Sequence, residues 1–263
     1  MPRCRGLWPA FAVRDDLQSL PEFVESMPPR YGWQICERAA AEHVRLVRQR
    51  RDQMVSVGAF PSPDREGYGL CVVADDAPGL LALISAALVL CSLDILEAEA
   101  YTRHSPHAKA EAVDLFWVRH AHPAESVPLN DADIAEFRET MEDLLSSNER
   151  PALSRRHPDS LTPSATETSI RFVEDNAGRV TTLEIETRDR SGLLLSVTEA
   201  LFKESVQIVG SHIATRHGRV HDRFELVEFD GSPINKGRRH TLQLAVLAAV
   251  DRGGSAEVAV THS

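Results

Sequence analysis

Cysteine, aromatic residues and long apolar runs are scarce in this chain of 263 residues. Its four cysteines form no Cys-x-x-Cys pair, so the sequence predicts neither a zinc knuckle nor a disulfide framework, which suits a reducing cytoplasm. The longest apolar stretch, residues 79–93, is shorter than the roughly 20 residues that a membrane span needs. We therefore expect a soluble cytoplasmic protein that does not enter a membrane.

Positive charge is also in short supply. The chain has 29 Lys and Arg against 39 Asp and Glu, which gives a formal net charge of −10. Nucleic-acid binding relies on basic surfaces, so nucleic acid is not an expected partner. With 43% hydrophobic residues, the chain still has enough apolar material for one or two ordinary cores.

A duplicated pattern organises most of the chain. The turn Asp76-Ala-Pro-Gly-Leu80 recurs as Asp189-Arg-Ser-Gly-Leu193. At the same spacing Ile95 recurs as Ile208 and Thr102-Arg103 as Thr215-Arg216, and a little further on Asp114-Leu-Phe116 recurs as Asp222-Arg-Phe224.

Hydrophobic periodicity gives both copies the same order of elements. In the first copy it predicts strands over 68–74, 95–103, 113–120 and 169–173, with helices that start after the turn and at residue 131. The second copy has predicted strands at 181–187, 208–216, 220–227 and 256–260, with a second helix near 239–250. Asp76 and Asp189 are the expected N-caps of the helices after the two turns.

This order is βαββαβ, so the fold class is α+β, with two ferredoxin-like units. We expect the first unit at 66–175 and the second at 178–263. Residues 1–65 are predicted to form an N-terminal extension and a helical connector, with a helix over 34–54. The helix over 80–93 is apolar on almost every side, so it needs a second partner, either the other copy or a homodimer.

These motifs resemble a known family. The two copies, each with its Asp-x-x-Gly-Leu turn and Asp-x-Phe strand, are similar to ACT domains, small modules that bind amino acids and other metabolites. Phe116-Trp117-Val118, Ile213-Ala-Thr-Arg216 and Glu42-His43-Val-Arg45 resemble the C-terminal region of the bifunctional uridylyltransferase/uridylyl-removing enzymes, which modify the nitrogen-signalling protein PII. Ser191 replaces a usual Pro, and Asp94 and Gln207 stand where Asn is common.

The resemblance implies ligand sites between neighbouring units. Unpaired N–H groups at a helix N-terminus suit a carboxylate, glycine lets a ligand approach the backbone, and an acidic side chain suits an ammonium group. We expect the first turn and the second-strand start of each unit to bind a small amino acid. The candidate residues are Asp76, Ala77, Gly79, Leu80, Asp94, Ile95, Asp189, Arg190, Ser191, Gly192, Leu193, Gln207 and Ile208.

Catalysis and metal binding are not expected. A nucleotidyltransferase needs carboxylates around Mg²⁺ behind a Gly-Ser turn, whereas Asp131 and Asp133 open an amphipathic helix without such a turn. A hydrolase of the HD type needs several His and Asp ligands, and His221-Asp222 is a single pair. The remaining histidine pairs flank turns without cysteine or a carboxylate cluster. No catalytic residue, metal or cofactor is predicted.

The sequence therefore predicts a regulatory tandem ACT protein, not an enzyme. The resemblance favours glutamine as the ligand and a protein partner in nitrogen or amino-acid metabolism. Two alternatives stay open: a non-catalytic C-terminal fragment or degenerate relative of the uridylyltransferase, and a purely structural interaction module.

Overall fold

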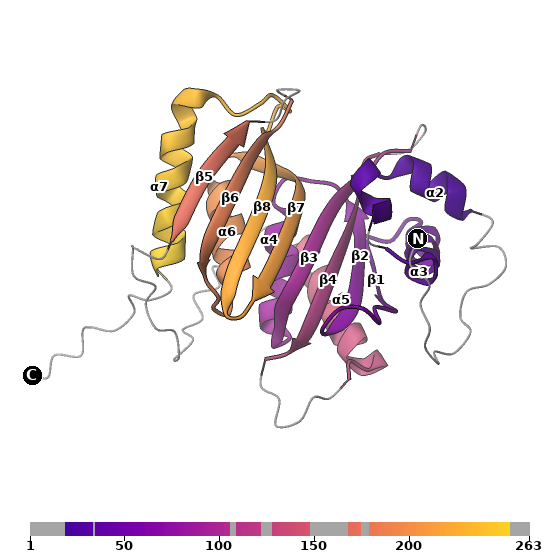
Figure 1. The fold of residues 1–263 in the computed structure, drawn as a ribbon. Helices are drawn as coiled ribbons and strands as arrows, with labels where there is room; N and C mark the ends of the chain where they lie inside the picture. The colour runs from indigo at the N-terminus through magenta and orange to yellow at the C-terminus, as the bar shows by residue number, and fades with distance from the viewer. Residues whose placement is uncertain are drawn as a thin grey trace, which may run out of the picture.

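One continuous eight-stranded antiparallel sheet runs through the protein (Figure 1). The computed structural model describes residues 19–33, 35–105, 109–121, 128–147, 168–174 and 179–252. The strands are β1 (Val55–Phe60), β2 (Tyr68–Asp75), β3 (Leu93–Arg103), β4 (Glu111–His120), β5 (Ser169–Glu174), β6 (Thr181–Arg188), β7 (Val206–Arg216) and β8 (Arg219–Glu228). The helices are α2 (Leu20–Ser26), the 3₁₀ helix η1 (Pro29–Trp33), α3 (Glu37–Arg50), α4 (Leu80–Leu90), α5 (Asp131–Ser146), α6 (Leu193–Lys203) and α7 (Lys236–Arg252).

The strand order β1-β2-β4-β3-β7-β8-β6-β5 divides the sheet into two equivalent halves. Each half has four antiparallel strands and two helices, so the α+β class and the two ferredoxin-like units are confirmed.

The strand that completes the first half was assigned wrongly from the sequence. Ser169–Glu174 was expected to close the first unit, but β5 pairs with β6 and belongs to the second half. The first half is completed by β1, which pairs with β2 and lies in the expected N-terminal extension. Each edge strand therefore precedes its unit instead of following it. The predicted strand at 256–260 lies outside the described residues.

The two halves meet along β3 and β7. These strands pair antiparallel, with Glu97 opposite Ala214, Glu99 opposite His212 and Tyr101 opposite Gly210. Glu99 and His212 occupy equivalent positions in the two copies, so the pairing is symmetric about this pair. The duplication thus generates a pseudo-two-fold axis within one chain.

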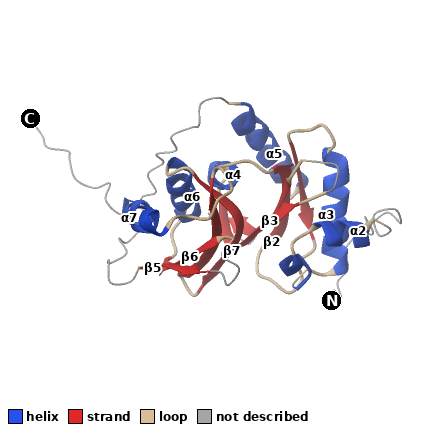
Figure 2. Cartoon of the chain, turned by 90° about the horizontal axis from the view of Figure 1, so that it is seen from above, coloured by secondary structure: helices blue, strands red, loops and turns tan. Residues whose placement is uncertain are grey.

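Helices α4, α5, α6 and α7 cover one face of the sheet (Figure 2). Helix α4 is buried on almost every side because it packs on the sheet, on α5 and on α6. The prediction that this apolar helix packs between the two copies is confirmed. A continuous hydrophobic core extends from one half to the other and includes Leu80, Leu88, Phe116, Leu201 and Phe224.

Glycine, not aspartate, occupies the N-cap position of α4 and of α6. Gly79 has φ 82° and Gly192 has φ 72°, a left-handed conformation that glycine adopts without a steric cost. The prediction that Asp76 and Asp189 cap these helices is wrong, because the chain makes a further turn before each helix begins. Helix α5 instead starts with the capping box of Asn130 and Asp133.

The N-terminal connector covers the other face of the first half. Helix α3 lies within the predicted helix at 34–54, while α2 and η1 had no prediction. Beneath them Tyr31, His43, Phe60 and Trp117 form a chain of edge-to-face aromatic contacts. Cys36, just before α3, is disulfide-bonded, which differs from the expectation for the cysteines, whereas Cys71 and Cys91 are free thiols.

Within the described residues, no helix combines the length and apolar character that crossing a membrane requires. The same part of the chain holds no cluster of three or more His, Cys, Asp or Glu side chains suited to a metal ion.

Candidate functional site between the two units

Two hollows lie at the junction of the two halves, one beside each Asp-x-x-Gly-Leu turn. The first hollow combines the turn at residues 76–80 with strand residues of the other half. Its lining includes Asp76, Gly79, Thr102, Asp114, Val206 and Ile208. A molecule in this hollow would therefore touch both copies.

The second hollow is the counterpart of the first. It combines the turn at 189–193 with the start of β3 in the first half. Its lining includes Asp94, Arg119, Asp189, Arg190, Gly192 and Asp222. Each hollow thus joins the turn of one copy to the start of the central strand, β7 or β3, of the other.

The structure brings the candidate residues together in two groups. Those lining the first hollow are Asp76, Ala77, Gly79, Leu80 and Ile208. Those lining the second are Asp94, Ile95, Asp189, Arg190, Ser191, Gly192 and Leu193. Gln207 is absent from both linings in the described structure, but its side chain hydrogen-bonds Asp76.

The carboxylate of Asp76 is already bound within the protein. Thr102 Oγ1 donates to Asp76 Oδ2 at 2.7 Å, and the same hydroxyl approaches the Val209 carbonyl oxygen at 3.3 Å. Burial raises the pKa of Asp76, while the hydrogen bonds from Thr102 and Gln207 act to lower it. This side chain therefore links its own unit to β7 of the other.

Asp189 has different neighbours. Burial raises its pKa, the nearby Asp94 carboxylate raises it further, and the backbone N–H of Arg190 and the charges of Arg119 and Arg190 act in the opposite direction. The carboxylates of Asp94 and Asp189, one from each unit, therefore lie close enough to interact electrostatically.

Two buried aspartates at the floors of the hollows were missed by the sequence reasoning. Asp114 and Asp222 are 3% exposed, and each accepts a backbone N–H from the neighbouring strand, Tyr101 for the first and Ala214 for the second. Burial raises the pKa of Asp114 to about 8 and raises that of Asp222 well above its ordinary value. The sequence pattern could have indicated the burial of Asp222. It lies on the same side of β8 as the apolar residues Val220 and Phe224, which point inward.

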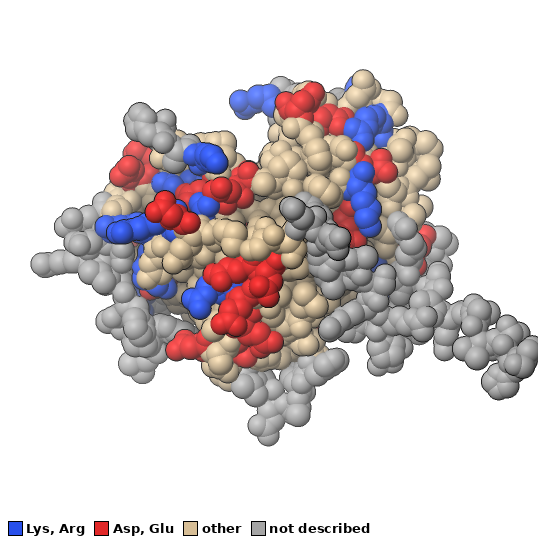
Figure 3. Space-filling view, turned by 180° about the vertical axis from the view of Figure 1, so that it is seen from behind, with Lys and Arg blue, Asp and Glu red and all other residues tan. Residues whose placement is uncertain are grey.

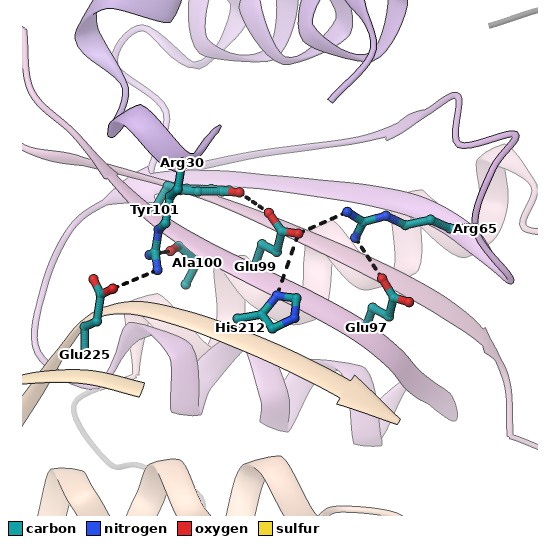
Figure 4. Close-up of polar contacts among 8 residues, drawn as sticks. All are labelled: Arg30, Arg65, Glu97, Glu99, Ala100, Tyr101, His212 and Glu225. Carbon is teal, nitrogen blue, oxygen red and sulfur yellow. Dashed lines mark hydrogen bonds and ion pairs between the residues drawn. The ribbon is translucent and has the colours of Figure 1, made fainter. Parts of the chain in front are cut away.

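Polar groups also join the two units on the opposite face of the sheet (Figure 4). Arg30 of η1 donates to the Ala100 carbonyl oxygen at 2.8 Å and to Glu225 at 3.2 Å, so the connector contacts both halves. Glu99 accepts hydrogen bonds from Tyr101 and Arg65 and pairs with His212 across the β3–β7 junction. Any change in the angle between the halves would therefore disturb the connector.

The charges on the helix-bearing side are mixed. On the face that Figure 3 shows, acidic side chains gather in clusters and basic side chains lie among them. This face offers no continuous basic track, which agrees with the net charge of −10.

The relatives of this chain among curated proteins include several bacterial enzymes of one kind. The bifunctional uridylyltransferase/uridylyl-removing enzyme of Rhodospirillum rubrum is 30% identical over 218 residues, which is 79% of this chain and 22% of the enzyme. Those of Cereibacter sphaeroides and Gluconobacter oxydans are 26% and 29% identical over 88% of this chain, and the chain covers 25% of each. These matches fall in the C-terminal region of the enzymes.

This chain is similar to the C-terminal region of these enzymes. It spans about a quarter of the length of the curated relatives it matches. No family model matches the chain. Among solved structures, aspartate kinase from Synechocystis aligns with 74% of this chain and 41% of its own chain, at 10% identity and a TM-score of 0.21, too low to compare folds.

Proposed function

We propose that this ACT pair is a non-catalytic sensor that binds a small amino acid between its two units and thereby regulates a partner protein. The observation that carries the proposal is the construction of the hollows. In each, the turn of one unit lies beside the start of β7 or β3 of the other. A ligand held there contacts both units at once. Its binding energy then depends on how the units are arranged.

The chemistry of the hollows suits a zwitterion. Each has a helix N-terminus behind a left-handed glycine, where backbone N–H groups attract a carboxylate. Acidic side chains line both hollows, and those of the second, Asp94, Asp189 and Asp222, can attract an ammonium group. Glutamine is the proposed ligand because of the resemblance to the uridylyltransferase C-terminal region.

The connector supplies an output for the sensor. Arg30 contacts the first unit at Ala100 and the second at Glu225, so it reports on their relative position. A ligand that binds one arrangement better shifts the population toward it, and the connector moves with that shift. The proposed partner is then a protein or domain adjoining this connector, in the nitrogen or amino-acid metabolism that the resemblance implies.

A thermal-shift screen tests amino-acid binding. The purified chain is heated with each of the twenty standard amino acids, and the D-enantiomers serve as controls. A ligand at about 100 times its dissociation constant adds roughly 2.7 kcal/mol of stability, which raises the midpoint by several degrees. We expect L-glutamine to give the largest shift.

Two results would contradict the proposal. If no amino acid shifts the midpoint, the ACT pair is a structural interaction module. If the purified chain alone transfers uridylyl groups to PII, the non-catalytic part of the proposal is wrong.

A further inference from the structure

The two hollows differ in one buried atom. Asp222 Oδ1, at the floor of the second hollow, has no hydrogen-bond partner among the described residues, although its side chain is almost completely buried. A buried acceptor without a donor costs free energy comparable to a lost hydrogen bond. A bound molecule that donates a hydrogen bond to this atom would recover that free energy.

The first hollow satisfies its own polar groups. Asp76 is bound by Thr102 and Gln207, and Asp114 accepts the Tyr101 N–H. Among the described residues no Lys or Arg side chain lines this hollow, so a ligand carboxylate finds no cationic side chain there.

The second hollow has charges of both signs. Asp94, Asp189 and Asp222 line it together with Arg119 and Arg190. Arg190 is oriented by the carbonyl oxygen of Ala249 at 3.1 Å, and its buried Nε atom has no partner among the described residues. This hollow thus has an unpaired acceptor on an acidic residue, Asp222, and an unpaired donor on a basic residue, Arg190. A zwitterion has groups that complement both.

We propose that the second hollow is the one ligand site of this chain, and that it takes a small molecule with a protonated primary amine, which donates to Asp222, and a carboxylate, which lies near Arg190 and the start of α6. The first hollow is structural. This inference rests on the proposed function and specifies which half performs it. It also makes Asp222, beneath the turn, a specificity-determining residue.

Isothermal titration of the full chain with the twenty amino acids, and with the 2-hydroxy acid of each one that binds, tests the assignment. We expect one site per chain and at least a tenfold weaker affinity for the 2-hydroxy acid, which lacks the amine. Asp222→Asn keeps the acceptor for Ala214 but loses the charge, so it should weaken binding at least tenfold. The matched variant Asp114→Asn should change the affinity less than threefold.

A second pair of variants covers the case in which Asp222→Asn does not fold. Gly192 has φ 72° and Gly231 has φ 83°, so alanine causes similar backbone strain at either position. A methyl group at Gly192 has only Val89 nearby, at 4.0 Å, and both residues line the second hollow, whereas Gly231 lies in the loop between β8 and α7. Gly192→Ala should weaken binding at least fivefold and Gly231→Ala should leave it unchanged.

The outcomes separate the two proposals. Two sites per chain, or binding that Asp114→Asn weakens as much as Asp222→Asn does, would overturn the assignment to the second hollow and leave amino-acid sensing intact. Equal affinity for an amino acid and its 2-hydroxy acid would overturn the role of the amine. No binding of any amino acid to the unmodified chain would overturn the proposed function itself.

Discussion

Thr102 donates a hydrogen bond of 2.7 Å to Asp76, while the equivalent pair in the second unit, Thr215 and Asp189, forms none in the described structure. The two units share sequence motifs and topology, yet they differ at the side chains next to the hollows. This difference supports the proposal that the first hollow holds the units together and that the second takes the ligand.

Thr102→Val tests the structural role of the first hollow. The change removes the donor to a partly buried carboxylate, so we expect a loss of about 1–2 kcal/mol in the free energy of unfolding. Urea denaturation measures it. Thr215→Val is the matched control and should cost less than about 0.5 kcal/mol, because that hydroxyl does not bond Asp189. Equal losses for the two variants would contradict the assignment.

Gly210→Ala tests the contact between the connector and both units. A Cβ atom at Gly210 would overlap the Arg30 guanidinium and approach Glu225, so Arg30 must leave its position. We expect Gly210→Ala and Arg30→Ala each to cost about 1–3 kcal/mol, because both remove the charge-assisted hydrogen bonds of Arg30. A double-mutant cycle by urea denaturation should show that the double variant costs little more than either single change. Additive costs would mean that the two residues act independently.

The buried imidazole of His43 makes the connector sensitive to acid. Burial lowers the pKa of His43 to about 3, below its ordinary 6.5, so the unfolded chain takes up the proton first. The neutral ring therefore makes its full contribution to the free energy of unfolding above pH 6.5. This contribution is lost as the pH falls toward 3. Between pH 6.5 and 5 we expect this group to contribute a loss of about 2 kcal/mol.

His43→Gln provides the comparison for that loss. The amide keeps a hydrogen-bonding group near the Tyr31 hydroxyl, which lies 2.6 Å from His43 Nδ1, but it does not titrate. Urea midpoints at pH 6.5 and 5 should differ less in this variant than in the unmodified chain. The same pH dependence in both would show that His43 is not the responsible group.

Asp114 has the opposite effect at higher pH. Burial, together with the nearby Asp76 charge, raises its pKa to about 8, so the folded protein retains a proton that the unfolded chain has released above about pH 4. Stability should therefore fall by about 1 kcal/mol between pH 6.5 and 7.5. Asp114→Asn should make this decline smaller, as measured by urea denaturation, whereas Asp222, whose pKa is also raised by burial, keeps its own contribution. A decline of unchanged size in the variant would place the titrating group elsewhere.

The duplicated pattern made most of the fold predictable from the sequence. The turns, the two apolar helices after them and the paired central strands all follow from local periodicity and from the repetition of motifs. The packing of α4 between its own sheet and α6 also followed, because a helix that is apolar on every side has no stable exposed face.

The edge strands were not predictable in the same way. Both β1 and β5 are short, and either could complete a four-stranded unit, so their assignment depends on pairing between distant segments. The continuation of the predicted helix to residue 54 also concealed the turn after Arg50, where Arg51 adopts a positive φ of 39°.

The candidate site followed from the sequence only where residues lie along one turn or strand start. Asp114 and Asp222 were noticed as markers of the repeat, but their burial depends on the helices above them. The difference between the hollows depends on single hydrogen bonds, such as that from Thr102 to Asp76, which no local pattern encodes.

The pairing of Glu99 with His212 on the pseudo-two-fold axis records what a fused duplication permits. In an assembly of two identical chains, the residue on the axis must face its own copy, so an acid meets an acid and a base meets a base. Joining both copies in one polypeptide removes that restriction. The two positions at the centre of the β3–β7 junction can then hold different, complementary side chains. A dimer of identical chains must place the same side chain at both positions.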